Sequence, residues 1–111
     1  MLFRAVAGNR AGELVLEGEI DMSVTDQLAG LLVKAAEDGQ PILDVGGVTF
    51  MDSSGLNVLI QAASARNGSS PIVVKNVHGL VQRLFEVALP QGVPGLELWS
   101  DEGMPLGAVH E

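Results

Sequence analysis

Cysteine is absent from the 111-residue sequence. Its absence excludes disulfide bonds, thiolate metal sites and a cysteine nucleophile, and it fits a cytoplasmic protein, which is the location we expect. The chain also lacks any run of about 18 apolar residues, so we expect no membrane span. Its opening residues, MLFRAVAGNRAGE, contain no sustained apolar segment, which argues against a secretory signal.

Basic residues are few and scattered. Six lysine and arginine residues stand against fourteen aspartate and glutamate residues, which gives a net charge of −8. Nucleic-acid binding requires clustered Lys and Arg that replace the counterions of phosphates, so we expect no direct contact with nucleic acid. The acidity either serves solubility or steers the protein toward a basic surface on a protein partner.

The composition indicates one globular domain. Hydrophobic residues make up 47% and charged residues 18% of a chain of ordinary single-domain length. We place the domain at residues 1–100. The remaining residues 101–111, DEGMPLGAVHE, predict a frayed C-terminal tail.

Apolar periodicity predicts strands and helices that alternate along most of the chain. The turn GNRAG joins the first two strands as a hairpin, and Gly46-Gly47 interrupts the third. The expected strands are 2–7, 13–20, 41–45, 72–74 and a short one within 93–99. The expected helices begin at Ser23, at Ser53 and just after Asn76, with Ser23 and Asn76 as predicted caps.

This β-β-α-β-α-β-α-β order predicts an α/β fold, with a mixed, mostly parallel sheet and the helices as crossovers. Loops that follow parallel strands share one edge of the sheet, where open α/β sheets build their sites. Asp21 and Asp52 each follow a strand and precede a helix. The pattern therefore places both aspartates at this edge.

Residues 51–56, MDSSGL, put an acid and two hydroxyl groups at the start of the second expected helix. Asp52 or either serine is a suitable N-cap, because its side-chain oxygen accepts a free backbone N–H. A cap requires only one such residue. Capping therefore accounts for part of the stretch and not for its density of polar groups.

A catalytic serine is a poor interpretation of the same stretch. Neither Ser53 nor Ser54 lies in a Gly-x-Ser-x-Gly frame. The two histidines, His78 and His110, fall at a helix start and in the tail, where a fixed base is hard to build. The glycine pairs lack the lysine and spacing of a phosphate loop, and the carboxylates lack metal-binding spacing. We expect no cofactor, no metal and no enzymatic activity.

A third interpretation is that a serine of this stretch is a substrate and not a catalyst. A serine at a helix N-terminus has an accessible hydroxyl on a rigid support, close to free N–H groups. Phosphorylation adds about 1.5–2 negative charges, which the positive end of the helix tolerates. The domain then stays folded while the face that it presents to a partner changes.

Three segments resemble the STAS domains, above all the bacterial anti-sigma factor antagonists: LEGEIDMSVTDQL (16–28), DVGGVTFMDSSGLNVLIQA (44–62) and VHGLVQRLFEVALP (77–90). The likeness covers nearly the whole chain in order. Its most specific part is FMDSSGL (50–56) together with GEID (18–21). Relatives often carry Thr-Ala where this chain has Val24-Thr25, and the glycine- and proline-containing end leaves little room for their terminal helix.

The resemblance implies a single STAS-type domain that acts as a partner-switching regulator. Ser53, the first serine after the aspartate, is then the phosphorylated residue. The unphosphorylated domain binds an anti-sigma factor, a serine kinase with a histidine-kinase-like ATPase fold, and so frees the sigma factor. Phosphorylation releases the kinase, and a serine phosphatase restores binding.

A kinase-facing surface is expected around Ser53. Ser54 should support the turn, Gly55 should permit close approach of the partner, Met51 is the favoured exposed apolar contact, and Phe50 is assigned to the core. The alternative is a STAS scaffold or ligand-binding module, stressosome-like or lipid-transport-associated, that is never phosphorylated. A weak homodimer is left open. The predicted contact residues are Asp21, Met51, Asp52, Ser54 and Gly55.

Overall fold

The structure is a computed structural model that describes residues 2–66 and 69–106. Its strands form one sheet whose spatial order follows the sequence. The four central strands run parallel, and the two edge strands are antiparallel to their neighbours. The predicted mixed, mostly parallel sheet is confirmed. The strands are β1 (Phe3–Ala7), β2 (Glu13–Ile20), β3 (Ile42–Met51), β4 (Ile72–Val77), β5 (Leu96–Ser100) and β6 (Pro105–Leu106).

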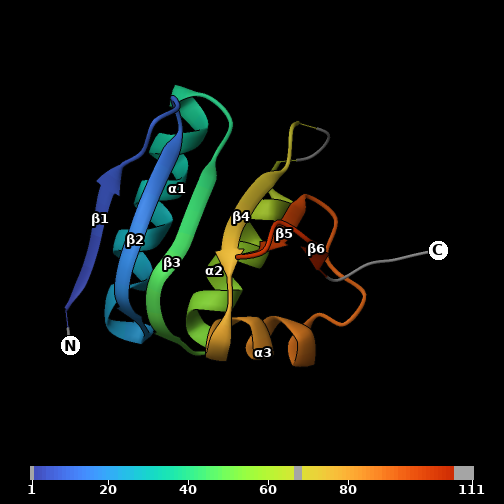
Figure 1. Cartoon of the computed structure of the whole chain (residues 1–111). Coiled ribbons are helices and arrows are strands. Elements are labelled where there is room, and N and C mark those ends of the chain that lie inside the picture. Colours follow the sequence, from blue (N-terminus) through green and yellow to red (C-terminus); the bar gives the residue numbers. More distant parts are fainter. Residues whose placement is uncertain (1, 67–68, 107–111) are drawn as a thin grey trace.

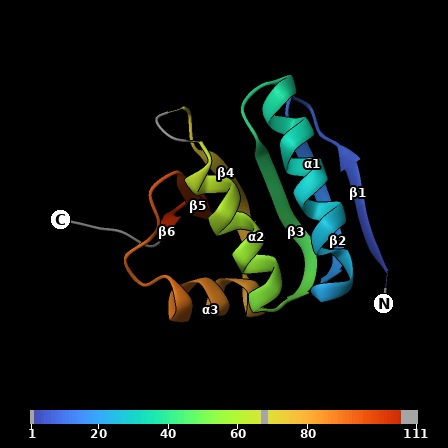
Figure 2. The ribbon, with the colours of Figure 1, turned by 180° about the vertical axis from the view of Figure 1, so that it is seen from behind.

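The helices connect consecutive parallel strands. They are η1 (Met22–Val24), a single 3-10 turn, followed by α1 (Thr25–Asp38), α2 (Ser53–Ser64) and α3 (Gly79–Ala88). Helices α1 and α2 lie side by side on one face of the sheet, and α3 lies along the edge where β3 and β4 end (Figures 1 and 2). In the part of the chain that the structure describes, no helix has the length and apolar character to cross a membrane.

The hydrophobic core fills the space between the sheet and the helices. Buried strand residues alternate with more exposed ones, as in β5, whereas buried helix residues recur every three or four positions, as in α1 and α2. Both periods match the sequence pattern. The most completely buried side chains include Leu16, Ile20, Leu28, Leu43, Leu59 and Phe85.

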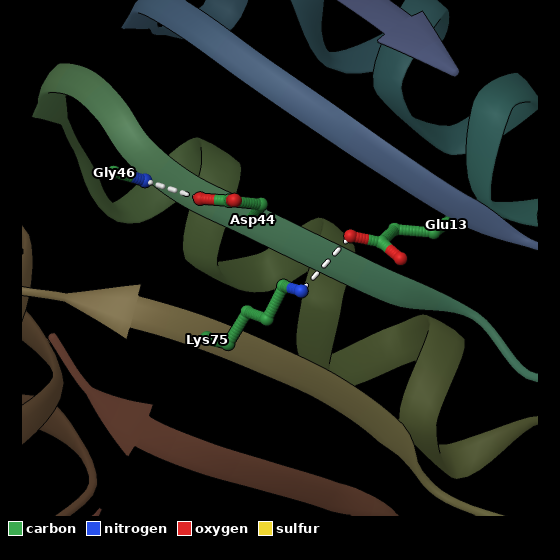
Figure 3. Close-up of polar contacts among 4 residues, drawn as sticks. All are labelled: Glu13, Asp44, Gly46 and Lys75. Carbon is green, nitrogen blue, oxygen red and sulfur yellow. Dashed lines mark hydrogen bonds and ion pairs between the residues drawn. The ribbon is translucent and has the colours of Figure 1, made fainter. Parts of the chain in front are cut away.

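The opposite face of the central strands carries charged side chains. The Lys75 Nζ lies 2.9 Å from a carboxylate oxygen of Glu13, and this ion pair passes across β3 (Figure 3). Farther along β3, an Asp44 carboxylate oxygen accepts a hydrogen bond from the Gly46 backbone N–H at 3.0 Å. The Glu13 side chain is only 6% exposed, so its charge depends on Lys75 for compensation.

Strand β3 is longer than the sequence predicts. The expected interruption at Gly46-Gly47 is wrong, because the strand continues through both glycines to Met51. Gly47 pairs with Glu17, and a Cβ at position 47 would lie 2.9 Å from the Glu17 Cγ. Glycine there lets β2 and β3 approach closely, and the extended strand delivers Met51 to a position beside Ile20.

Two further boundaries differ from expectation. Asn76 does not cap α3, because β4 continues to Val77 and Asn76 adopts a left-handed backbone with φ of 61°. Residues 105–106, within the segment expected to be a tail, pair with β5 as strand β6. The last expected strand is β5, which begins only at Leu96.

Candidate functional site

The ends of β2 and β3 lie side by side. Ile20 and Met51 are Cα partners in the parallel ladder, and the Asp52 N–H donates to the Ile20 carbonyl oxygen at 3.2 Å. Asp21 and Asp52 therefore leave the sheet from neighbouring positions. The structure thus brings together the two carboxylates that the topology placed at one edge.

Asp52 is the N-cap of α2. Its Oδ1 accepts the Ser54 backbone N–H at 2.9 Å and also accepts the Ser54 hydroxyl. The capping interpretation of this stretch is confirmed for Asp52, and capping of this kind stabilises a helix by about 1 kcal/mol. The Ser54 hydroxyl is thereby engaged in holding the turn.

Asp21 makes the same arrangement one strand away. Its Oδ1 accepts the Ser23 hydroxyl at 2.6 Å and the Ser23 backbone N–H at 2.9 Å. These two hydrogen bonds hold the pKa of the Asp21 carboxyl below its ordinary value, because both favour the charged form. The prediction that Ser23 caps the first helix is wrong, since Asp21 is the acceptor and Ser23 the donor.

Ser53 occupies the first position of α2 and is exposed. Within residues 2–66 and 69–106, no hydrogen bond engages its hydroxyl, in contrast to the bonded hydroxyl of Ser54. Its place at the helix N-terminus puts it beside backbone N–H groups that have no acceptor within the helix. Of the two serines, Ser53 is the one that offers an unengaged oxygen to solvent.

Gly55 and Met51 lie in the core and not on the surface. Met51 is 6% exposed, because it lies opposite Ile20 on the helix-covered face, whereas Phe50 on the alternate face is 40% exposed. The expectation that Met51 is exposed and Phe50 buried is therefore wrong. Gly55 is buried, and a Cβ there would lie 2.6 Å from Ile20 Cγ2. Its small size admits Ile20 and not a partner protein.

Met22 also lies at this edge of the sheet, and no feature of the sequence had predicted a role for it. It is 77% exposed and lies between Asp21 and Ser23, as Ser53 lies between Asp52 and Ser54. The available signal was the repeated Asp-x-Ser pattern after two neighbouring strands. Residues 21–23 are DMS and residues 52–54 are DSS, so Met22 and Ser53 occupy the same place in the two loops.

Of the two histidines considered as a catalytic base, His78 lies within the described residues. His78 lies at the start of α3, where its Nε2 is 2.9 Å from the Gly46 carbonyl oxygen. His110 lies outside the described residues. In the described ranges, no three His, Asp or Glu side chains gather closely enough to hold a metal ion.

The protein is a single α/β domain with a mixed sheet, and it displays Ser53 next to the capping Asp52. Residues 4–91 match the family described as Mlab, STAS domain. This match spans most of the chain, so the chain belongs to the STAS domain family, as its sequence motifs predict. The fold is also similar to the structure titled "Structure of the Anti-Sigma Factor Antagonist SpoIIAA in its Unphosphorylated Form". That similarity has a TM-score of 0.53 and 20% identity, over 86% of each chain.

Proposed function

We propose that this STAS domain is an anti-sigma factor antagonist that is switched by phosphorylation of Ser53. In its unphosphorylated form it binds an anti-sigma serine kinase with a histidine-kinase-like ATPase fold, and the sigma factor is free to direct transcription. Phosphorylated Ser53 ends this binding, and a serine phosphatase reverses the change. The domain itself works in the cytoplasm as a binding protein and has no catalytic role.

One observation carries the proposal: Ser53 is exposed with an unengaged hydroxyl, while the adjacent Ser54 hydroxyl is bonded to Asp52. A kinase that reaches this edge finds a phosphoryl acceptor at Ser53 without breaking the cap. The new phosphate lies at the positive end of α2, where the helix dipole and the first N–H groups favour an anion. Phosphorylation therefore leaves the fold intact.

Electrostatics give a physical reason for release. Asp21 and Asp52 already place two negative charges beside Ser53, and the phosphate adds about 1.5–2 more. In an interface, this charge must lose its hydration, which costs several kcal/mol unless a matching cation is present. A kinase surface whose basic groups pair only with Asp21 and Asp52 has no further cation for the phosphate. The bound state is therefore lost while the domain stays folded.

Phosphorylation by a candidate kinase tests this function. The kinase and ATP are incubated with the parent protein, with Ser53→Ala and with the matched control Ser54→Ala, and tandem mass spectrometry locates the phosphate. We expect phosphate on Ser53 in the parent and in Ser54→Ala, and none in Ser53→Ala. Ser53→Ala should also stay bound to the kinase, and Ser53→Asp should bind weakly. Phosphate elsewhere, or full binding by Ser53→Asp, contradicts the proposal.

An apolar groove between α1 and α2 favours a second candidate, a STAS ligand-binding module without phosphorylation, such as one associated with lipid transport. The groove has a volume of about 510 Å³, and its lining includes Leu32, Val33, Val58 and Ala62. Such a module should purify with an apolar molecule that native mass spectrometry detects. Filling the groove with Ala62→Leu should remove that molecule, whereas Ser53→Ala should leave it bound.

A further inference from the structure

Two exposed apolar side chains lie at the same edge of the sheet as Ser53. Met22 is 77% exposed and Phe50 is 40% exposed, although both residue types are usually buried. We propose that Met22 and Phe50 are the apolar anchors by which the Ser53 kinase holds the unphosphorylated domain. This inference rests on the proposed function and adds to it the residues that provide the affinity.

The register of the sheet places Met22 beside Ser53. Ile20 and Met51 are Cα partners, and Met22 and Ser53 each follow these partners by two residues. Both loops then make the same turn, since an aspartate caps each one through the serine two positions later. Neighbouring strands lie about 4.8 Å apart, so the two positions are separated by roughly one to two strand spacings.

Phe50 lies close to the same serine along the chain. It precedes Ser53 by three residues, which limits their separation to about 10 Å. It pairs with Glu19 at the end of the ladder, and its ring lies on the face opposite to the buried Met51. Met22 and Phe50 therefore lie near Ser53 on two different elements.

A kinase that transfers a phosphoryl group to Ser53 must also cover the surface around it. A typical protein interface covers about 800 Å² of each partner, which corresponds to a radius of roughly 16 Å. Both apolar side chains fall within this distance of Ser53. Methionine and aromatic residues are enriched at interface centres, where charged residues are depleted. The carboxylates of Asp21 and Asp52 then require basic groups on the kinase.

This arrangement explains why one phosphate is sufficient for release. The apolar anchors exclude water from the contact around Ser53 and so lower the local dielectric constant. A phosphate that enters this dry contact has lost its hydration and lies near the carboxylates of Asp21 and Asp52. The anchors that provide affinity for the hydroxyl form therefore also increase the penalty for the phosphorylated form.

Titration calorimetry tests the inference. The binding partner is a purified, ADP-bound serine kinase of the histidine-kinase-like ATPase class from the same organism. We expect Met22→Ala and Phe50→Ala each to raise the Kd by about 10-fold or more, as for other interface anchors. The matched control is Val87→Ala near the C-terminal end of α3, which is 75% exposed; it should bind within about 2-fold of the parent. Met22→Glu should bind more weakly still. Because Met22 is 77% exposed, this variant should remain folded, which thermal denaturation can verify.

The outcomes separate this inference from the function on which it depends. If the parent binds and receives phosphate on Ser53 while Met22→Ala, Met22→Glu and Phe50→Ala bind like the parent, only the anchor assignment is overturned. If the parent neither binds the kinase nor receives phosphate, the proposed function and the anchor assignment both fail. Loss of binding in the anchor variants with an unaffected Val87→Ala supports the assignment.

Discussion

Gly55 lies where α2 comes closest to the sheet, and its replacement by alanine tests this packing. A Cβ at position 55 would lie 2.6 Å from Ile20 Cγ2 and 3.1 Å from Met51 Cγ. Carbon atoms in favourable contact are about 3.5–4.0 Å apart, so the first contact is short by about 1 Å. Ile20 is 0% exposed and has no free space into which to rotate.

The expected loss of stability follows from two opposing effects. Overpacking a core costs about 1–3 kcal/mol, and complete burial of Ile20 places this case near the upper end. Alanine in place of glycine inside a helix recovers about 1 kcal/mol. The net free energy of unfolding should fall by about 2 kcal/mol, which corresponds to a decrease in Tm of roughly 8 °C for a domain of this size.

Urea denaturation and thermal melting measure both quantities, with Gly30→Ala as the matched control. Gly30 is exposed within α1, and no atom lies within 4 Å of a Cβ placed there. This substitution should stabilise the protein by about 0.5–1 kcal/mol through helix propensity alone. The same chemical change should therefore have opposite signs at the two positions. A Gly55→Ala protein as stable as the parent would refute the close contact between α2 and Ile20.

Three further changes test the caps and the ion pair. Asp52→Ala removes the cap of α2 and should lower the free energy of unfolding in urea by about 0.5–2 kcal/mol; an unchanged midpoint contradicts the capping role. Because folding lowers the pKa of Asp21, its carboxylate stabilises the native state above the unfolded pKa of 3.8, and this contribution disappears as the pH falls through the folded value. An NMR titration should show this lowered pKa, and Asp21→Asn should unfold with less pH dependence in acid, whereas an ordinary pKa refutes the assignment. Lys75→Met leaves the buried Glu13 carboxylate unpaired and should cost about 1–3 kcal/mol in chemical denaturation, and additional Glu13→Gln should restore part of the loss; strict additivity of the two changes contradicts the pairing.

Local periodicity and turn chemistry were sufficient to predict the element order. Alternating apolar residues in β2 and the three-to-four spacing in α1 and α2 reflect the faces that these elements bury, so they are readable from sequence. Asp52 as a helix cap was also predictable, because its donor lies only two residues away. These features depend on neighbours in the chain and need no knowledge of the tertiary structure.

Features that depend on distant segments were not predictable in the same way. Residue-type preference favours Phe50 over Met51 for the core, but pairing with Ile20 decides which of the two faces the helices. The continuation of β3 through Gly47 likewise depends on β2, which lies against it. The sequence alone predicts that Gly55 is accessible to a partner. The need for glycine there is seen only in the structure, where Ile20 packs against it.

In the proposed function, the two capped loops use different residues to hold the turn and to contact the kinase. In each loop the aspartate bonds to the serine two positions later, so the turn is fixed by its first and third residues and not by the side chain of the middle one. That middle residue is Met22 after β2 and Ser53 after β3. Because both are exposed, their chemistry can change without loss of the cap. A phosphate on Ser54 instead would remove the hydroxyl proton that Asp52 accepts and set two anions against each other within the cap. A phosphate on Ser53 leaves that cap in place, which supports Ser53 over Ser54 as the proposed acceptor.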